Sequence, residues 1–317
     1  MQKQAIRVLL LPKFETGAMT GDFPGEAQHL YEDWCIGGQE YEIRGGFPSH
    51  KLYVRDGVAL YVTGMGKVNA ALSLQAVLLD PRFDFSDCYV ISVGCAGSAW
   101  GRTVMGDVVV VTAALDYDLG HHADIRELPE NTEVTWFHDP AFDSSACRFL
   151  NRNLTDRVYD LLKDMQPRTT EQTKAFMAHA FNHAPWAIRE PQVIRGTTIS
   201  GDNYWKGESG RRNAEEMVRV YGCPDHFTLA EMEDVALAVA LDRLGMLDRY
   251  IVIRSSVNMD CFMNGQTPHS LWKGGHVIAA ESSAESADIF PTAMENNARA
   301  VGKVIAAILD GSLIVER

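Results

Sequence analysis

Three carboxylates lie together at the start of an apolar stretch. Glu231, Glu233 and Asp234 precede Val235–Leu241, a run that predicts a buried helix. Acidic residues at a helix start complement the helix dipole, which is the plain structural interpretation. A carboxylate beside a buried helix must, however, be paired or accept hydrogen bonds. The pattern therefore also fits a glutamate, here Glu233, that accepts from two neighbouring hydroxyls of a sugar.

Two glycine-containing segments follow predicted strands. They read Gly64-Met65-Gly66-Lys67 and Gly94-Cys95-Ala96-Gly97. Backbone N–H groups at a helix start can hold an anion or a hydroxyl, and small residues let a flat ligand approach the chain. Ordinary tight turns are the alternative for both. The first segment matches neither a Walker loop nor a dinucleotide fingerprint, and no histidine partner indicates that Cys95 is a nucleophile.

Two further predicted strands end in polar and aromatic residues. After Ser200-Gly201-Asp202-Asn203 come Tyr204 and Trp205, which could stack on a planar base or pack in the core. After the predicted strand Tyr250–Ser255, Asn258 and Asp260 could donate to, or protonate, a leaving group. A plain polar loop is the alternative for this last segment.

The amino-acid composition excludes several classes of protein. The chain has 317 residues, of which 46% are hydrophobic and 22% charged, enough for a substantial core and against a disordered chain or a disulfide miniprotein. With 29 Lys+Arg against 42 Asp+Glu it lacks a basic footprint for nucleic acid or anionic lipid. No apolar run approaches the ~20 residues of a membrane-spanning helix.

The cysteines and the N-terminal segment indicate the cellular compartment, and the histidines are the candidates for a metal site. Six scattered cysteines without a Cys-x-x-Cys pair fit free thiols, with one or two disulfides left open. The adjacent His121 and His122 fit exposed or pocket-rim positions rather than a metal site. The apolar run that ends at Pro12 predicts a buried strand rather than a signal peptide. We expect a cytoplasmic protein, with the periplasm open if a leader was removed.

Strand-like runs alternate with helical patterns along the chain, which predicts a mainly parallel sheet between helices, with ligands at the strand ends. Residues 118–191 are least regular and fit an insertion or lid. The predicted strands are Ile6–Leu11, Gly57–Thr63, Cys88–Val93, Val108–Thr112, Gln192–Ser200 and Tyr250–Ser255. The predicted helices are Asn69–Leu79, Leu154–Lys163, Glu171–Ala180, Leu229–Leu244 and Asn296–Leu309.

Taken in order, these segments resemble the nucleoside phosphorylase superfamily and, within it, the purine nucleoside permease family. The most specific matches are Gly64-Met65-Gly66-Lys67-Val68-Asn69-Ala70, Met105-Gly106-Asp107-Val108-Val109, Ser200-Gly201-Asp202-Asn203-Tyr204 and Glu231-Met232-Glu233. The resemblance implies one α/β domain over residues 1–317. Its three layers would hold a central mixed, partly barrel-like sheet flanked by helices.

The resemblance also implies a site. Tyr204 matches the aromatic that stacks on the purine, and Met232 and Glu233 match the pair that holds the ribose. Gly64, Met65 and Gly66, with Gly94, Cys95, Ala96 and Gly97, would line the pocket floor near the anion or attacking water. Ser200 and Asp202 belong to the same substrate-binding set. No metal or cofactor is implied, and a homo-oligomer is expected.

The chain departs from the superfamily pattern at both ends of this site. Where the superfamily has a base-side aspartate, this chain has Asn258, which cannot give a proton. Asp260 is then either the acid or a residue that only braces the loop. In the first-strand loop, Glu15 stands where phosphorolytic relatives have a basic residue, and a glutamate there orients a water in hydrolytic relatives. Phosphate remains open as co-substrate if Lys13 and backbone amides bind it.

The expected function is binding of purine nucleosides with cleavage of the N-glycosidic bond, by phosphate or by water. The alternative is a non-catalytic nucleoside-binding component of purine nucleoside uptake. Neither reading needs a membrane span or a nucleic acid partner.

Overall fold

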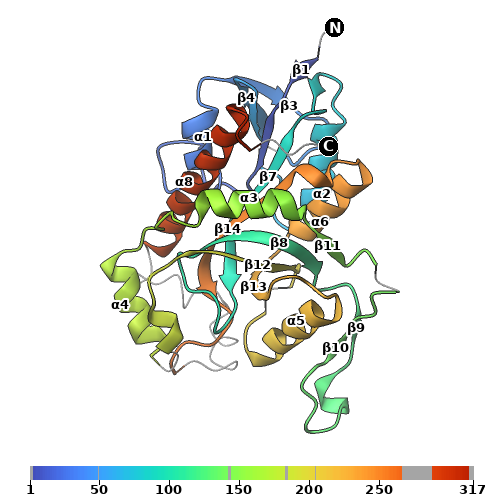
Figure 1. Ribbon diagram of the computed structural model, residues 1–317, viewed down its shortest axis with the longest axis vertical. Coiled ribbons are helices and arrows are strands. Elements are labelled where there is room, and N and C mark those ends of the chain that lie inside the picture. The colour runs from blue at the N-terminus through green and yellow to red at the C-terminus, as the bar shows by residue number, and fades with distance from the viewer. Residues whose placement is uncertain are drawn as a thin grey trace.

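A ten-stranded mixed sheet forms the centre of the computed structural model, which describes residues 3–48, 50–141, 144–182, 185–203, 205–265 and 288–313 (Figure 1). The sheet runs in the order β11-β8-β12-β13-β7-β2-β5-β4-β3, and β14 pairs with both β7 and β8. Its strands are β2 (Val8–Leu11), β3 (Gln39–Glu42), β4 (Lys51–Arg55), β5 (Val58–Leu60), β7 (Tyr89–Ser98), β8 (Val108–Asp116), β11 (Cys147–Phe149), β12 (Val193–Ser200), β13 (Phe227–Glu231) and β14 (Tyr250–Met259).

Part of this sheet closes on itself. β14 runs parallel to β7 and antiparallel to β8, β8 is parallel to β12, β12 is parallel to β13, and β13 returns antiparallel to β7. These five strands form a ring, while β2, β5, β4 and β3 extend from β7 as an open sheet. The predicted mixed, partly barrel-like sheet is confirmed.

Alternation along the strands divides the core between the two sides of the sheet. In β2, Val8 and Leu10 pack into one hydrophobic cluster, and Leu9 and Leu11 into another. Successive strand side chains point to opposite faces, so a strand that is apolar throughout must be covered on both. The continuous valine run of β8 follows the same rule.

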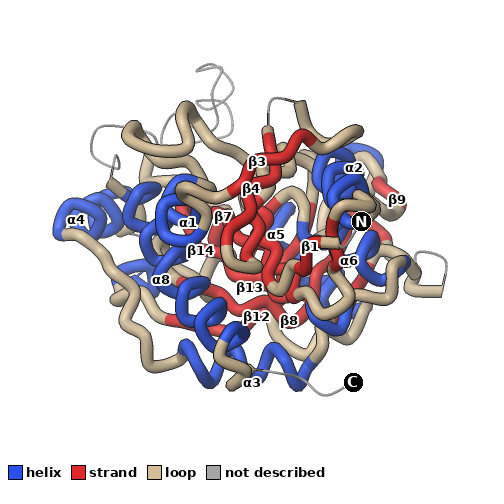
Figure 2. The backbone as a smooth tube through the Cα atoms, turned by 90° about the horizontal axis from the view of Figure 1, so that it is seen from above, coloured by secondary structure: helices blue, strands red, loops and turns tan. Residues whose placement is uncertain are grey.

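Helices cover both faces (Figures 1 and 2). The first cluster includes buried residues of α1, α3 and α8, and the second includes residues of α2 and α6; α5 packs on a third cluster beside β12 and β13. The helices are α1 (Gln28–Trp34), α2 (Lys67–Leu78), α3 (Arg152–Leu162), α4 (Glu171–Ala180), α5 (Glu208–Val220), α6 (Asp234–Arg243) and α8 (Ile289–Leu309).

The irregular stretch 118–191 contains α3, α4, β11 and a short hairpin. The hairpin pairs β9 (His121–His122) with β10 (Trp136–Phe137), and both histidines are exposed, as expected. A further two-stranded sheet joins β1 (Gln4–Ala5) to β6 (Phe83–Asp84). All six cysteines are free thiols. Among the described residues, no helix combines the length and apolarity needed to cross a membrane.

Several sequence predictions were wrong in extent, and three of them concern the closed ring. The segment Gly94–Gly97, expected as a loop, lies inside β7, and β14 continues to Met259 past its predicted end. The predicted helix Leu229–Leu244 is divided, since Phe227–Glu231 is a strand and α6 begins at Asp234. In the first two cases pairing within the closed ring extends a strand whose glycine or polar residues suggested that it had ended. In the third, pairing with β12 and β7 makes Phe227–Glu231 a strand.

Candidate active site

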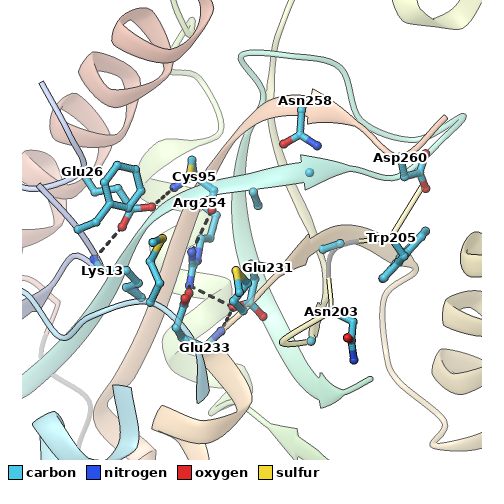
Figure 3. A pocket seen from close by; sticks show the side chains of 17 residues that line it. Lys13, Glu26, Cys95, Asn203, Trp205, Glu231, Glu233, Arg254, Asn258 and Asp260 are labelled. Carbon is cyan, nitrogen blue, oxygen red and sulfur yellow. Dashed lines mark hydrogen bonds and ion pairs between the residues drawn. The ribbon is translucent and has the colours of Figure 1, made fainter. Parts of the chain in front are cut away.

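A pocket of about 120 Å³ lies where β7, β12, β13 and β14 end, as the fold class predicts. Figure 3 shows Lys13 and Glu26 at one end of it, and Trp205 and Asp260 at the other. Glu233 lies between the two ends. The pocket is therefore elongated between an acidic end and an end with an aromatic ring.

Glu26 supplies the carboxylate at the first end. It precedes α1 and is buried, and its two oxygens each accept a hydrogen bond of 2.7 Å from a backbone N–H, of Lys13 and of Cys95. A Cβ at Gly94 would lie 2.3 Å from Oε1 of Glu26, so only glycine leaves room for the carboxylate. The glycine thus serves a close approach within a strand rather than a turn.

Glu233 occupies the middle of the pocket and is held at both oxygens. The backbone N–H of Gly66 donates to Oε1 at 2.9 Å, and Arg254 donates to Oε2 at 3.0 Å. Gly66 has a φ of +88°, which a glycine adopts without strain, and this turns its N–H towards the carboxylate. Burial raises the pKa of Glu233, while the charges of Arg254 and Lys13 lower it.

Arg254 lines the pocket and binds three carboxylates. Its guanidinium contacts Glu231 at 3.1 Å, Glu233 at 3.0 Å and Asp234 at 2.8 Å, and also donates to the backbone oxygen of Cys95. Burial raises the pKa of Glu231 to about 7, whereas for Asp234 the charges of Arg254 and Lys13 outweigh burial and lower the pKa. The arrangement fixes the glutamate that faces the pocket.

Lys13 is the second buried cation of this site. Its ammonium group donates to the backbone oxygens of Leu11 and Val93, at 2.6 and 3.2 Å, and to Ser92 Oγ at 2.6 Å. Ser92 in turn donates to Asp234 Oδ1 at 2.6 Å. All three N–H bonds of the ammonium are therefore used inside the protein.

The other end of the pocket carries neutral and aromatic groups. The Asn258 side chain extends from β14 towards the pocket, and a Cβ at Gly97 would lie 3.1 Å from its amide nitrogen (Figure 3). Burial raises the pKa of Asp260 to about 8. A hydrogen bond from the Trp100 backbone and the charge of Arg211 lower the pKa and offset part of this rise. A carboxyl with this pKa is protonated at neutral pH and can donate a hydrogen bond.

Trp205 forms part of the wall at the same end. Its ring stacks on Tyr117 at 5.3 Å between centroids, and Tyr117 stacks on Trp136 at 4.5 Å. A Cβ at Gly210 of α5 would lie 2.2 Å from the indole, so the ring packs directly against that helix. The indole is thus fixed in position.

Eight of the predicted site residues line the pocket: Met65, Cys95, Ala96, Gly97, Met232, Glu233, Asn258 and Asp260. Gly64, Gly66 and Gly94 lie next to it, and Gly66 and Gly94 act through Glu233 and Glu26. Burial and the charge of Glu26 raise the pKa of Cys95, which disfavours a nucleophilic thiolate there.

Other predicted residues are placed differently. Glu15 is not among the pocket residues, and its carboxylate accepts from the backbone N–H groups of Gly25, Ala27 and Gln28 at the start of α1. Ser200 lies behind the pocket, where its hydroxyl donates to Glu231. Asp202 accepts from the Lys67 backbone at 3.0 Å. Tyr204 lies outside the described residues.

Sequence reasoning missed Glu26 and the role of Arg254. Glu26 is separated from the first strand by a long loop, and the available signal was its place directly before the helical pattern of α1. Arg254 stands inside the apolar run of β14. A charged residue within a buried strand needs partners, and three carboxylates close to one another supply them. Among the described residues, no cluster of histidine, cysteine and carboxylate side chains could hold a metal ion.

Comparison with known proteins supplies the family and the fold. The purine nucleoside permease (NUP) family model matches residues 5–312. A probable purine nucleoside permease of Schizosaccharomyces pombe is 26% identical over 237 residues, covering 68% of each chain.

Two solved structures share the fold. The 5'-methylthioadenosine/S-adenosylhomocysteine nucleosidase of Neisseria meningitidis superimposes with a TM-score of 0.56 at 17% identity, over 95% of this chain and 99% of that one. Futalosine hydrolase of Helicobacter pylori gives 0.58 at 14% identity, over 96% and 97%. The closed sheet, the pocket at its strand ends and a family match over almost the whole sequence agree, and the chain belongs to the purine nucleoside permease family.

Proposed function

We propose that this protein is a purine nucleosidase, which binds a purine nucleoside and cleaves its N-glycosidic bond with water. The observation that carries the proposal is the Glu26 carboxylate, fixed by two backbone N–H groups at one end of a pocket that also holds Glu233. Two solved structures with this fold are named as a nucleosidase and a hydrolase, which supports the same proposal.

The sugar would bind in the middle of the pocket. Glu233 can accept hydrogen bonds from the two vicinal hydroxyls of ribose, because Gly66 and Arg254 each occupy only part of one oxygen. As the bond to the base breaks, the ribose gains oxocarbenium character. A fixed negative charge beside it stabilises that developing positive charge.

Water suits the acidic end better than phosphate does. The Lys13 ammonium is a cation at this end of the pocket, and all its N–H groups donate within the protein, to Leu11, Ser92 and Val93. Phosphate would therefore meet the Glu26 carboxylate without a free cation from Lys13. A water there can instead give its proton to Glu26 while its oxygen attacks the anomeric carbon.

The base would leave at the other end of the pocket. The electron pair of the glycosidic bond passes to the purine, which takes up a proton. Asp260 can supply that proton in its neutral form, and the Asn258 amide can hydrogen-bond a ring nitrogen. Trp205 would provide an apolar wall for the ring.

The test is incubation of the protein with adenosine and with inosine, with and without phosphate, followed by chromatography for free base. We expect release of base at equal rates in both conditions, and release that requires phosphate would refute hydrolysis. Glu26→Gln should lower turnover by about 100-fold or more. Glu15→Gln is the matched control from the same loop, and it should reduce thermal stability while folded protein keeps its turnover.

Asn258 favours a second candidate, a non-catalytic nucleoside-binding component of purine nucleoside uptake. An amide holds a purine but does not protonate it. Calorimetry that shows tight nucleoside binding, together with no base release over hours, would support this candidate and reject the nucleosidase.

A further inference from the structure

Lys67 is not one of the described residues that line the pocket, but it lies two residues after Met65, which does. It is the first residue of α2 and directly follows Gly66, whose N–H donates to Glu233 at 2.9 Å. Its side chain is only 15% exposed, although it carries a charge. A charged group in such a place must be paired, so its partners indicate its role.

The Lys67 ammonium binds two carboxylates at the end of β8. Its Nζ lies 2.5 Å from Asp116 Oδ1 and 2.8 Å from Asp118 Oδ2, and these side chains are only 20% and 21% exposed. Burial lowers the pKa of Lys67, but the hydrogen bonds and charges of the two aspartates outweigh it and raise the pKa. The ammonium is therefore charged, and it ties the start of α2 to the end of β8 where water screens the charges little.

Asp118 extends this contact to a third segment, the residues after β12. Its Oδ2 also accepts from the Asp202 N–H at 2.7 Å, and its Oδ1 accepts from the Asn203 side chain at 3.1 Å. Asp202 Oδ1 in turn accepts from the Lys67 N–H at 3.0 Å. Lys67, Asp118 and Asp202 thus form a closed ring of hydrogen bonds, which we call the Lys67 clamp.

The Lys67 clamp joins two chain segments that build different parts of the pocket. In the segment before α2, the Gly66 N–H fixes Glu233 in the middle of the pocket. In the segment after β12, Asn203 lines the pocket on the side where Trp205 lies (Figure 3). The distance between these two parts of the pocket therefore depends on the clamp.

We propose that Lys67 is a positioning residue, which fixes the separation between Glu233 and the end of the pocket that holds Trp205. A cation is needed because Asp116 and Asp118 contact the same ammonium, and without it two like charges would lie close together. A nucleoside has a fixed length between sugar and base, so both parts bind well only if this separation is held. That consequence rests on the proposed function, whereas the joining of the two segments does not.

The first experiment is amide hydrogen exchange of the full chain without substrate, read by mass spectrometry. In Lys67→Met, peptides that contain Gly66 and Asp202 should exchange about 10-fold faster or more, while peptides of α8 stay unchanged, because only the clamped segments open. Lys51→Met removes a 2.8 Å pair with Glu40 and is the matched control, which should leave the exchange of all these peptides unchanged. Unchanged exchange in a folded Lys67→Met would overturn the proposal.

A second variant keeps the test decisive if Lys67→Met does not fold. Asp118→Asn retains the size of the side chain but removes its charge, and it should speed exchange in the same two peptides. The double variant should exchange no faster than the faster single variant, because both changes break one network, and additive increases would contradict the clamp. Lys67→Arg keeps the charge and offers several donors to the two aspartates, so it should restore slow exchange.

The consequence for the substrate is tested by calorimetry with adenosine and with free adenine. In Lys67→Met, adenosine should bind about 10-fold more weakly or more, whereas adenine, which needs only one end of the pocket, should keep its affinity. Equal losses for both ligands, or no loss for adenosine, would contradict the positioning role. A native protein that binds neither ligand would refute the proposed function, and the exchange experiment would still decide whether Lys67 holds the two segments together.

Discussion

Asp260 makes the stability of this protein depend on pH in a way that one substitution can reveal. The residue is buried, and burial raises the pKa of its carboxyl from 3.8 to about 8. The charged groups around it are Arg211 and Lys206, which favour the ionised form, and Glu215, which opposes it. The folded protein therefore keeps a proton on Asp260 that the unfolded chain loses near pH 4.

The direction and the size of this pH dependence follow from the number of protons that the folded and unfolded states bind. Between pH 4 and pH 8 the folded state binds more protons than the unfolded state, so the contribution of Asp260 to stability falls as pH rises. Each pH unit in this window costs about 1.4 kcal/mol, which gives about 4 kcal/mol between pH 4 and pH 7. Asn is close in shape to a neutral carboxyl but does not titrate, so Asp260→Asn removes this dependence.

The assay is urea unfolding of the native protein and Asp260→Asn at each pH unit from 4 to 9. The difference in unfolding free energy should shift in favour of the variant by about 1.4 kcal/mol per unit up to pH 8 and then stay level. Asp33→Asn, an exposed aspartate of α1, is the control for the general effect of removing one negative charge. A difference for Asp260→Asn that stays constant across this range would show that the carboxyl is ionised in the folded protein, and would remove it as a proton donor to the purine.

Three more predictions concern the acidic end and the middle of the pocket. Glu233→Gln should weaken ribonucleosides by about 10-fold or more but leave free bases unchanged in calorimetry, and equal losses for both would contradict the ribose role. Gly94→Ala should lower kcat by about 100-fold because its Cβ displaces Glu26, whereas Gly302→Ala, with its nearest neighbour at 3.9 Å, should not. Lys13→Met should move the acidic limb of the kcat/KM profile to higher pH, since the Lys13 charge lowers the pKa of Glu233. An unmoved limb in folded Lys13→Met would contradict that coupling.

The sequence was sufficient for elements whose pattern is local. The predicted helix Glu171–Ala180 matches α4, and the predicted helix Asn69–Leu79 corresponds closely to α2, because a two-glycine turn precedes it. The strand Val108–Thr112 was recognisable because it is apolar on both faces, although it continues to Asp116. Local periodicity and turn residues determine such elements without help from distant contacts.

Elements that depend on distant pairing were not predictable in the same way. Gly94–Gly97 has the composition of a turn, but pairing with β14 and β13 keeps it in a strand. Phe227–Glu231 lies next to a helical pattern, and only its place between β12 and β7 makes it a strand. Contacts between neighbouring strands override local propensity here.

The acidic end of the site was also not predictable from local sequence patterns. Both Glu15 and Glu26 belong to one loop after the first strand, and the family resemblance pointed to Glu15, which stands where phosphorolytic relatives have a basic residue. In the folded protein Glu15 accepts from three backbone N–H groups at the start of α1, which orients that helix start beside the pocket. Glu26 precedes the same helix and accepts a hydrogen bond from the N–H of Cys95. The choice between the two carboxylates depends on the folded loop, which no spacing rule describes.

The candidate site forms only when the five-stranded ring of the sheet closes. Arg254 is carried by β14, while Glu231 and Glu233 come from the end of β13, and these two strands lie on either side of β7 in the ring. Neither the guanidinium nor the carboxylates could be buried alone, because an unpaired buried charge costs several kcal/mol. The ions therefore become compatible with the interior only when the ring closes, and at that moment Glu233 acquires its fixed position. A site built in this way is rigid before any ligand arrives, which is what a carboxylate that must stabilise a short-lived positive charge requires.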